Sequence, residues 1–160
     1  MNIHEFGADK NKIIVLIHPS LVMWDYFEYI LSILKEEYHI IVPALPGYDE
    51  EKPNENFTSV EEIADNLLGW LKEHKIEKVD LLYGCSMGGS IALKMFSNHG
   101  IKIRNIICDG AITPYQLPWI VTRMIAIRDF LMISIGKIGG LKLLEKSFST
   151  DEYSEEELKY

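Results

Sequence analysis

The 160-residue sequence lacks an excess of positive charge. Its 16 lysine and arginine residues are outnumbered by 24 aspartate and glutamate residues, which gives a formal net charge of −8. Nucleic acids and anionic membranes bind proteins through clustered positive charge. We therefore expect no nucleic-acid partner, and we expect the acidic surface mainly to keep the protein soluble.

Long uninterrupted apolar runs are also absent. The most apolar region, residues 117–144, is broken by charged residues that include Arg123, Arg128, Asp129 and Lys137. A membrane-spanning helix needs about 20 consecutive, mostly apolar residues, so we expect no membrane span. Residues 1–9 do not combine a basic head with an apolar stretch, so we expect no secretory signal peptide.

Cysteine is scarce, with Cys85 and Cys108 alone in the whole sequence. Small secreted domains usually carry more cysteines in a spaced framework. Both residues lie in apolar runs, and we interpret them as buried thiols in a reducing compartment. The sequence thus predicts a cytoplasmic protein, and we expect neither a metal nor a cofactor.

The sequence does contain a regular alternation of strand-like and helix-like segments. Runs rich in β-branched and aliphatic residues predict buried strands at residues 12–17, 38–42, 78–83 and 103–108. Apolar residues at helical spacing predict helices at residues 24–37, 60–71 and 90–97. This order predicts an α/β fold, with a mostly parallel sheet and helices on both of its faces.

Capping signals mark the start of the helix predicted at residues 60–71. Ser59 with Glu62 matches a capping box, and Thr58 with Glu61 matches one equally well. The sequence leaves both alternatives open.

The pattern changes after Pro114. Residues 115–147 contain no strand-like run, and their apolar residues recur at spacings of three and four: Ile120, Met124, Ile127, Leu131 and Ile135. The sequence therefore predicts two parts, residues 1–114 and a helical, amphipathic segment within residues 115–160.

One motif carries chemistry. Gly84-Cys85-Ser86-Met87-Gly88 matches G-x-S-x-G between a predicted strand and a predicted helix, which is the setting of a nucleophilic serine. A sharp turn would present the Ser86 hydroxyl, while Gly84 and Gly88 allow strand and helix to approach closely. The positive end of the helix at Met87 would favour a developing oxyanion.

Two other interpretations of this motif concern glycine-rich turns in general. G-x-S-x-G also occurs by chance in glycine-rich turns. A dinucleotide-binding loop is excluded, because Ser86 stands where G-x-G-x-x-G has its middle glycine.

Together these segments resemble the α/β-hydrolase superfamily over about residues 3–114. The resemblance rests on His18-Pro19-Ser20 after the first long strand, Trp24 in the next helix, Pro46-Gly47 after the second strand, and Gly84–Gly89. It implies a serine hydrolase that acts on a small-molecule acyl substrate: an ester, a thioester, an amide or certain C–C bonds. Residues from 115 onward resemble the start of a lid, whose apolar face either lines an acyl pocket or packs as core.

The resemblance also implies roles for individual residues. The backbone N–H groups of Ser20 and Met87 would form the oxyanion hole, and His18 would hold the loop in shape. Pro19 stands where the family usually has glycine, which changes the loop but leaves Ser20 its N–H donor.

The catalytic base is the missing part. Of the five histidines only His18 is predicted at the carboxyl edge of the sheet; the others are His4, His39, His74 and His99. The resemblance gives His18 a supporting role, and its position leaves the role of base as the alternative. Asp109 follows a strand at that edge, and it is either a turn residue before Gly110 or the triad acid, as in a minority of the family.

We therefore expect the base and the acid to lie beyond these residues, in a fold that is truncated here. We also expect the 160 residues alone to show little or no turnover. A fragment, a non-catalytic binding protein, or a site completed by a second chain would each explain this pattern.

Overall fold

The computed structural model describes residues 1–111 and 117–139. The chain divides into two compact units, Met1–Pro114 and Tyr115–Tyr160. The first unit contains the sheet and its covering helices, and the described part of the second contains helix α4 (Trp119–Gly139). Across the described ranges, no helix combines the length and the apolar character needed to cross a bilayer.

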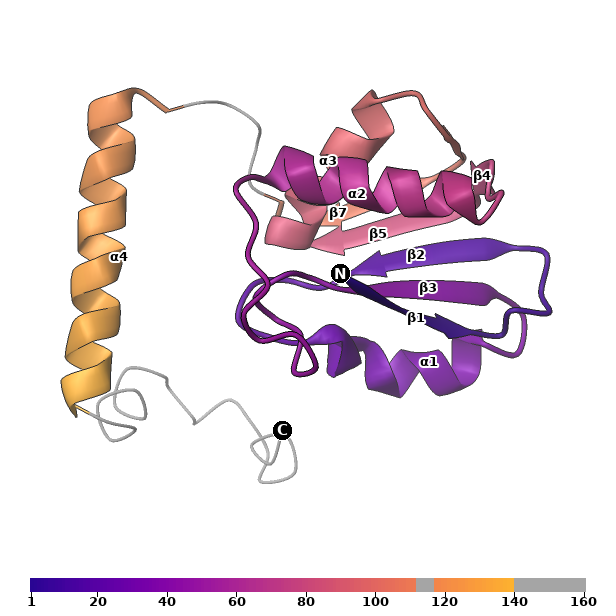
Figure 1. Cartoon of the computed structure of the whole chain (residues 1–160), viewed down its shortest axis with the longest axis horizontal. Helices are drawn as coiled ribbons and strands as arrows, with labels where there is room; N and C mark the ends of the chain where they lie inside the picture. The colour runs from indigo at the N-terminus through magenta and orange to yellow at the C-terminus, as the bar shows by residue number, and fades with distance from the viewer. Residues whose placement is uncertain (112–116, 140–160) are drawn as a thin grey trace. The chain divides into compact units, whose positions relative to one another are not determined.

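Five strands form the main sheet of the first unit (Figure 1). They are β1 (Asn2–Phe6), β2 (Ile13–Ile17), β3 (His39–Ala44), β5 (Leu81–Cys85) and β7 (Ile106–Asp109). Their spatial order is β1-β3-β2-β5-β7, and every pair is parallel except the edge pair β1–β3. This confirms the predicted α/β class with a mostly parallel sheet.

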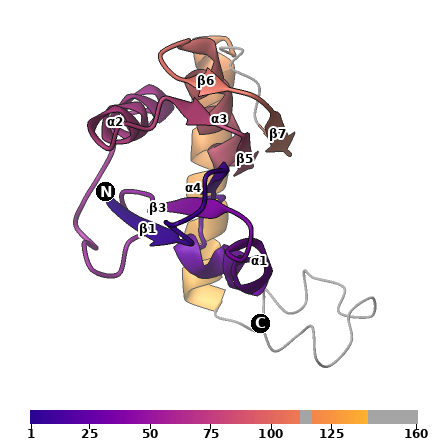
Figure 2. The same ribbon diagram turned by 90° about the vertical axis from the view of Figure 1, so that its right-hand side faces the viewer.

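The helices cover both faces of this sheet. Helix α1 (Glu28–Leu34) lies on one face, and α2 (Val60–Glu73) and α3 (Met87–Ser97) lie on the other; Figure 2 shows α1 and α2 on opposite sides of the strands. Parallel crossovers are right-handed, so a reversal in the direction of strand addition moves the connecting helix to the opposite face. The reversal occurs between β2 and β5, which makes the carboxyl ends of these strands the topological switch point of the sheet.

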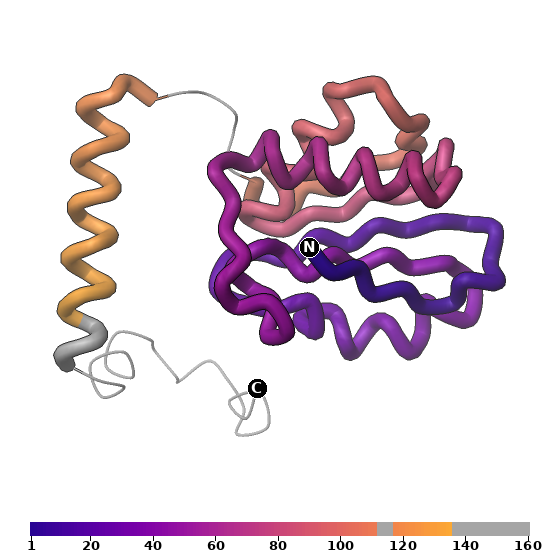
Figure 3. The backbone as a smooth tube through the Cα atoms, viewed as in Figure 1, coloured from indigo at the N-terminus to yellow at the C-terminus, as the bar shows by residue number. Residues whose placement is uncertain are grey.

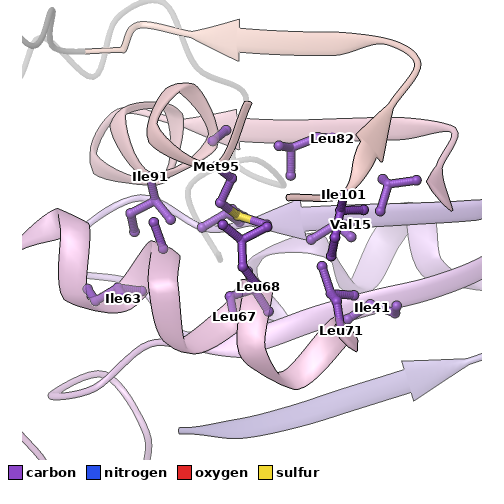
Figure 4. Close-up of a cluster of buried hydrophobic side chains, with 14 of the residues drawn as sticks. Val15, Ile41, Ile63, Leu67, Leu68, Leu71, Leu82, Ile91, Met95 and Ile101 are labelled. Atoms are coloured by element: carbon purple, nitrogen blue, oxygen red, sulfur yellow. The ribbon is translucent and has the colours of Figure 1, made fainter. Parts of the chain in front are cut away.

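The larger hydrophobic core lies between the sheet and the two helices α2 and α3 (Figure 4). Leu67 and Leu71 of α2 pack with Ile91 and Met95 of α3 over the sheet, and all four side chains are at most 1% exposed. The opposite face has a smaller cluster around Phe27 and Leu31. Beside it lies a groove of 960 Å³, lined in part by Tyr83 and Ile107, so the two faces are unequally covered.

Two predicted strands are each divided in the structure. Residues 78–83 split into β4 (Lys78–Val79) and β5, and residues 103–108 split into β6 (Lys102–Ile103) and β7. Strands β4 and β6 pair with each other in a separate two-stranded sheet. Asp80 marks the first break, because its carboxylate accepts a hydrogen bond from the Ile13 N–H at 3.1 Å.

The helix boundaries also differ from the predictions. The segment predicted as one helix at 24–37 starts as a 3₁₀ turn, Trp24–Phe27, and α1 ends at Leu34. Helix α3 begins at Met87, where the motif placed the helix end that faces Ser86, although the apolar spacing had marked only residues 90–97. Helix α4 occupies 119–139 of the segment predicted to be helical, and the prediction for residues 112–116 and 140–160 lies outside the described residues.

Candidate active site

Ser86 occupies a sharp turn that joins β5 directly to α3. Its backbone angles are φ 50° and ψ −115°, a conformation that residues with a side chain rarely adopt. Its N–H donates to the Asp109 carbonyl oxygen at 2.8 Å, and its own carbonyl accepts from the Gly89 N–H at 3.0 Å. Hydrogen bonds on both sides therefore hold the strained residue in place.

Two glycines make the turn sterically feasible. A Cβ atom on Gly84 would lie 2.2 Å from the carbonyl oxygen of Gly88. A Cβ atom on Gly88 would lie 2.3 Å from the Ile17 carbonyl oxygen and 2.7 Å from that of His18. All of these neighbours are backbone atoms, which cannot easily move away. The start of α3 therefore packs directly against the end of β2.

This contact brings the loops after β2 and β5 together at the carboxyl edge of the sheet. Figure 3 traces these loops, and the loop after β3, to the same end of the strands. They flank the point where the strand order reverses, and the carboxyl edge at that point is the usual position of a binding site in open α/β sheets.

The hydroxyl of Ser86 is not used to cap its helix. Ser86 is the N-cap residue of α3, yet its side chain makes no capping hydrogen bond. Met87 is the first helical residue, and its N–H is among those that helix geometry leaves without an intrahelical acceptor. A hydroxyl and a helix-terminal N–H are thus adjacent, at the positive end of the α3 dipole.

His18 links the loops after β2 and β3. Its side chain is fully buried, and its Nε2 accepts a hydrogen bond from the Leu45 N–H at 3.2 Å. Nε2 is therefore unprotonated, so the proton on Nδ1 is donated to the Pro19 carbonyl oxygen at 2.8 Å. Burial lowers the pKa of His18, which favours this neutral form. Because both ring nitrogens are engaged, neither is available to take a proton from Ser86.

Ser20 follows in a half-buried turn, beside the buried His18. The next residue, Leu21, has a φ of 69°. This second strained position at the carboxyl edge has no sequence signal, because leucine is not a residue that favours positive φ.

Asp109 lies at the end of β7, opposite Cys85 in the parallel pairing with β5. Its carboxylate accepts a hydrogen bond from the Tyr83 hydroxyl at 3.1 Å. The pKa of Tyr83 is raised to about 12, mainly by burial and secondly by this hydrogen bond. The backbone carbonyl of Asp109, which holds the Ser86 N–H, is a contribution that sequence reasoning missed.

The other four histidines lie away from Ser86. His39 pairs with Glu5 at 2.8 Å at the amino end of β3, and the His74 ring donates to the Trp70 carbonyl at the end of α2. His99 follows the end of α3, and His4 stacks on Trp24 from the edge strand β1. No histidine of the chain therefore provides a free ring nitrogen at the turn.

The two cysteines are free and only partly buried, whereas the sequence suggested buried thiols. Burial still raises the pKa of the Cys108 thiol. In residues 1–111 and 117–139, no three histidine, cysteine or acidic side chains are grouped so that they could hold a metal ion.

Comparison with known proteins identifies the family. The family model described as "alpha/beta hydrolase fold" matches residues 12–132. The chain is 27% identical over 114 residues to 2-hydroxymuconate semialdehyde hydrolase of Pseudomonas sp. strain CF600, a match that covers 69% of this chain and 39% of that protein.

Solved structures agree with this match. An α/β-hydrolase family protein from Desulfitobacterium hafniense superposes with a TM-score of 0.66 at 34% identity, over 69% of this chain and 44% of that one. An esterase from Exiguobacterium antarcticum gives a TM-score of 0.60 at 28% identity, over 70% and 41%. The chain spans about two fifths of the length of the curated relatives that it matches. Within that span, the sheet order, the turn at Ser86 and the family model agree, and the chain belongs to the α/β-hydrolase fold family.

Proposed function

We propose that this chain supplies the nucleophile and the oxyanion-binding groups of a serine hydrolase that cleaves a carboxylic ester or a related acyl bond in a small molecule. The strained turn at Ser86 carries the proposal, because it presents an uncapped hydroxyl beside a helix-terminal N–H. The relatives named as a hydrolase and an esterase support the same reaction class.

In the proposed reaction, the Ser86 Oγ forms a bond to the acyl carbon while its proton passes to a base. The carbonyl oxygen becomes an oxyanion, which the N–H groups of Met87 and Ser20 stabilise. The intermediate then collapses, and the alcohol leaves with the proton that the base returns. Water cleaves the acyl–serine ester by the same sequence of steps.

The proposal assigns the base and its acid partner to groups outside the 160 residues. All five histidines of the sequence are accounted for, and none is positioned to accept the Ser86 proton. Asp109 is given a positioning role, through the carbonyl that holds the Ser86 N–H. Without a base, the 160 residues alone should show little or no turnover.

A second candidate is a non-catalytic protein that binds acyl compounds on the same scaffold. The hydrogen bonds of His18 favour it, because they leave the histidine closest to the turn unable to act as a base. The two candidates differ in one property, which is whether the Ser86 hydroxyl can be made to react.

Fluorophosphonate labelling, read by intact mass, tests this property. We expect slow labelling of the 160-residue chain and faster labelling when imidazole is added, because free imidazole can replace the missing base. Ser86→Ala should abolish the labelling. Ser59→Ala is the matched control, since Ser59 is also the N-cap of a helix, and it should label like the wild type.

The outcomes separate the two candidates. Labelling that persists in Ser86→Ala would show that another residue reacts and would reject Ser86 as the nucleophile. An unlabelled Ser86, both with and without imidazole, would favour the non-catalytic protein.

A further inference from the structure

The loop after β2 differs in polarity from the other long loop at the carboxyl edge of the sheet. Between Ser20 and the 3₁₀ turn at Trp24 it consists of Leu21, Val22 and Met23. The loop after β3 is instead dominated by charged and amide residues over positions 49–56. Surface loops are usually polar, so three consecutive apolar residues beside the candidate site require a reason.

Leu21 combines two unfavourable states. Its side chain is 89% exposed, more than any other large hydrophobic residue in the described part of the chain, and its φ is 69°. An exposed leucine is ordinary by itself, but a leucine in the left-handed region is rare. Such strain persists where the surrounding structure imposes it, and it concentrates at functional sites.

The other strained non-glycine residues have separate explanations. Lys75 and His99 have φ values of 59° and 52°, and each follows the C-cap of a helix, where the left-handed conformation is common. Ser86 is the turn residue between β5 and α3. Leu21 lies at no helix C-terminus, and it shares the carboxyl edge with Ser86.

The loop is fixed at both ends. At its start His18 is buried, and its Nε2 accepts a hydrogen bond from the Leu45 N–H. At its end Trp24 stacks on His4, with ring centroids 3.9 Å apart, and on Phe6. Leu21 is therefore presented by anchored neighbours, one residue after the proposed oxyanion donor Ser20.

We propose that Leu21, with the 38% exposed Met23, forms an apolar wall that contacts the alkyl chain of an acyl group bound at Ser86. The wall would favour acyl groups with an extended alkyl chain over short ones. This inference rests on the proposed function, which places the acyl carbon at Ser86. It adds that the alkyl chain of the acyl group lies along the Leu21 side of the site.

Titration of the ¹⁵N-labelled protein with butanoate and octanoate, monitored by NMR, tests the wall without requiring turnover. We expect tighter binding of octanoate, with amide shifts at residues 20–23 and 86–88. Leu21→Asn keeps the left-handed backbone but removes the apolar side chain. It should lower the octanoate-to-butanoate affinity ratio about fivefold, as expected if about 40 Å² of leucine surface is buried on the alkyl chain.

Lys75→Asn is the matched control, because it places asparagine at a left-handed position on the opposite edge. It should leave the affinity ratio unchanged. Leu21→Gly provides a second variant if the asparagine protein folds poorly, and it should lower the ratio to the same extent.

An unchanged ratio in both Leu21 variants, or no octanoate binding at all, would overturn the proposal. Octanoate shifts confined to the groove beside Tyr83 and Ile107 would overturn it as well. If the Leu21 variants lower the affinity ratio as expected but Ser86 does not react with the fluorophosphonate, the apolar wall is supported and the hydrolase function is rejected. The failure of one proposal can therefore be distinguished from the failure of the other.

Discussion

Two serines at the same edge of the sheet begin helices in opposite ways. Ser59 is the N-cap of α2, with extended backbone angles of φ −159° and ψ 163°, and its hydroxyl accepts the Glu62 N–H at 3.2 Å. Ser86 is the N-cap of α3, with φ 50° and ψ −115°, and its hydroxyl makes no capping bond. The same side chain at the same helix position is used for capping in one place and left uncommitted in the other.

The difference lies in what holds each helix start. The first turn of α2 is stabilised locally, since Glu62 also accepts hydrogen bonds from the N–H and hydroxyl of Thr58 at 2.7 and 2.5 Å. The first turn of α3 is held by neighbouring strands, through the Asp109 carbonyl and the contact of Gly88 with Ile17. Because tertiary contacts replace the cap, the Ser86 hydroxyl remains available for chemistry.

The largest expected effect comes from filling the contact under α3. Gly88→Ala would place a Cβ 2.3 Å from a backbone oxygen of β2, so the start of the helix would have to move. We expect a loss of about 3 kcal/mol in the free energy of unfolding, measured by urea denaturation, in the range of severe overpacking.

Gly69→Ala is the matched control for this substitution. Gly69 lies inside α2, and a Cβ there would meet nothing within 4 Å. Alanine should raise the free energy of unfolding by up to about 1 kcal/mol, because glycine is a poor helix former. If Gly88→Ala were as well tolerated as Gly69→Ala, the close approach of α3 to β2 would not be needed to hold the turn.

A smaller effect on the free energy of unfolding should follow from protonating His18, whose hydrogen bonds link the loops beside the start of α3. Its pKa is lowered in the folded state by burial, so below pH 6.5 the unfolded chain binds more protons than the folded one. Stability should therefore fall as the pH falls below 6.5, by at most about 1.4 kcal/mol per pH unit. Protonation of Nε2 would also break its bond with the Leu45 N–H.

Urea denaturation at several pH values between 7.5 and 5 measures this dependence. His18→Gln should flatten it, because the buried ring that resists protonation is then absent. The hydrogen bond from Thr58 lowers the pKa of Glu62, so the local cap of α2 should weaken only in more acidic solution. A wild-type curve that is level from pH 6.5 to 5 would contradict the burial of a neutral His18.

The features that the sequence predicted are those encoded by local spacing. The G-x-S-x-G pattern placed residue 86 between a strand and a helix, and the structure has β5 and α3 on either side of it. The alternation of strand-like and helix-like segments is also a local pattern, and it predicted the α/β fold with a mostly parallel sheet. The sequence offered Ser59 with Glu62 and Thr58 with Glu61 as equal capping pairs, and the structure has Ser59 as the N-cap, accepting from the Glu62 N–H.

The features that escaped prediction depend on strand register and on tertiary contacts. The Asp109 carbonyl reaches Ser86 because β7 pairs with β5 in a particular register. The tautomer of His18 is set by Leu45, which is 27 residues away in sequence. The strain at Leu21 arises between two anchored ends of a loop, and no residue preference indicates it.

The smallest expected effect compares the two N-cap serines directly, and its sign is more informative than its size. Ser59→Gly removes a working cap, and should lower the free energy of unfolding by a few tenths of a kcal/mol. Ser86→Gly removes no cap and relieves the positive φ, a strain worth about 1–3 kcal/mol. The added flexibility of glycine in the unfolded chain offsets part of this relief, which leaves a gain of about 0.5–1 kcal/mol.

Ser86→Ala is the control that separates strain from the loss of the hydroxyl. Alanine keeps the strained backbone, so its stability should match the wild type, whereas only glycine should gain. Urea denaturation of all three variants under the same conditions provides the comparison. Equal losses for Ser59→Gly and Ser86→Gly would mean that the two helix starts are held in the same way. A gain confined to position 86 would show that its side chain is retained at a cost to stability, as expected for a residue kept for its chemistry.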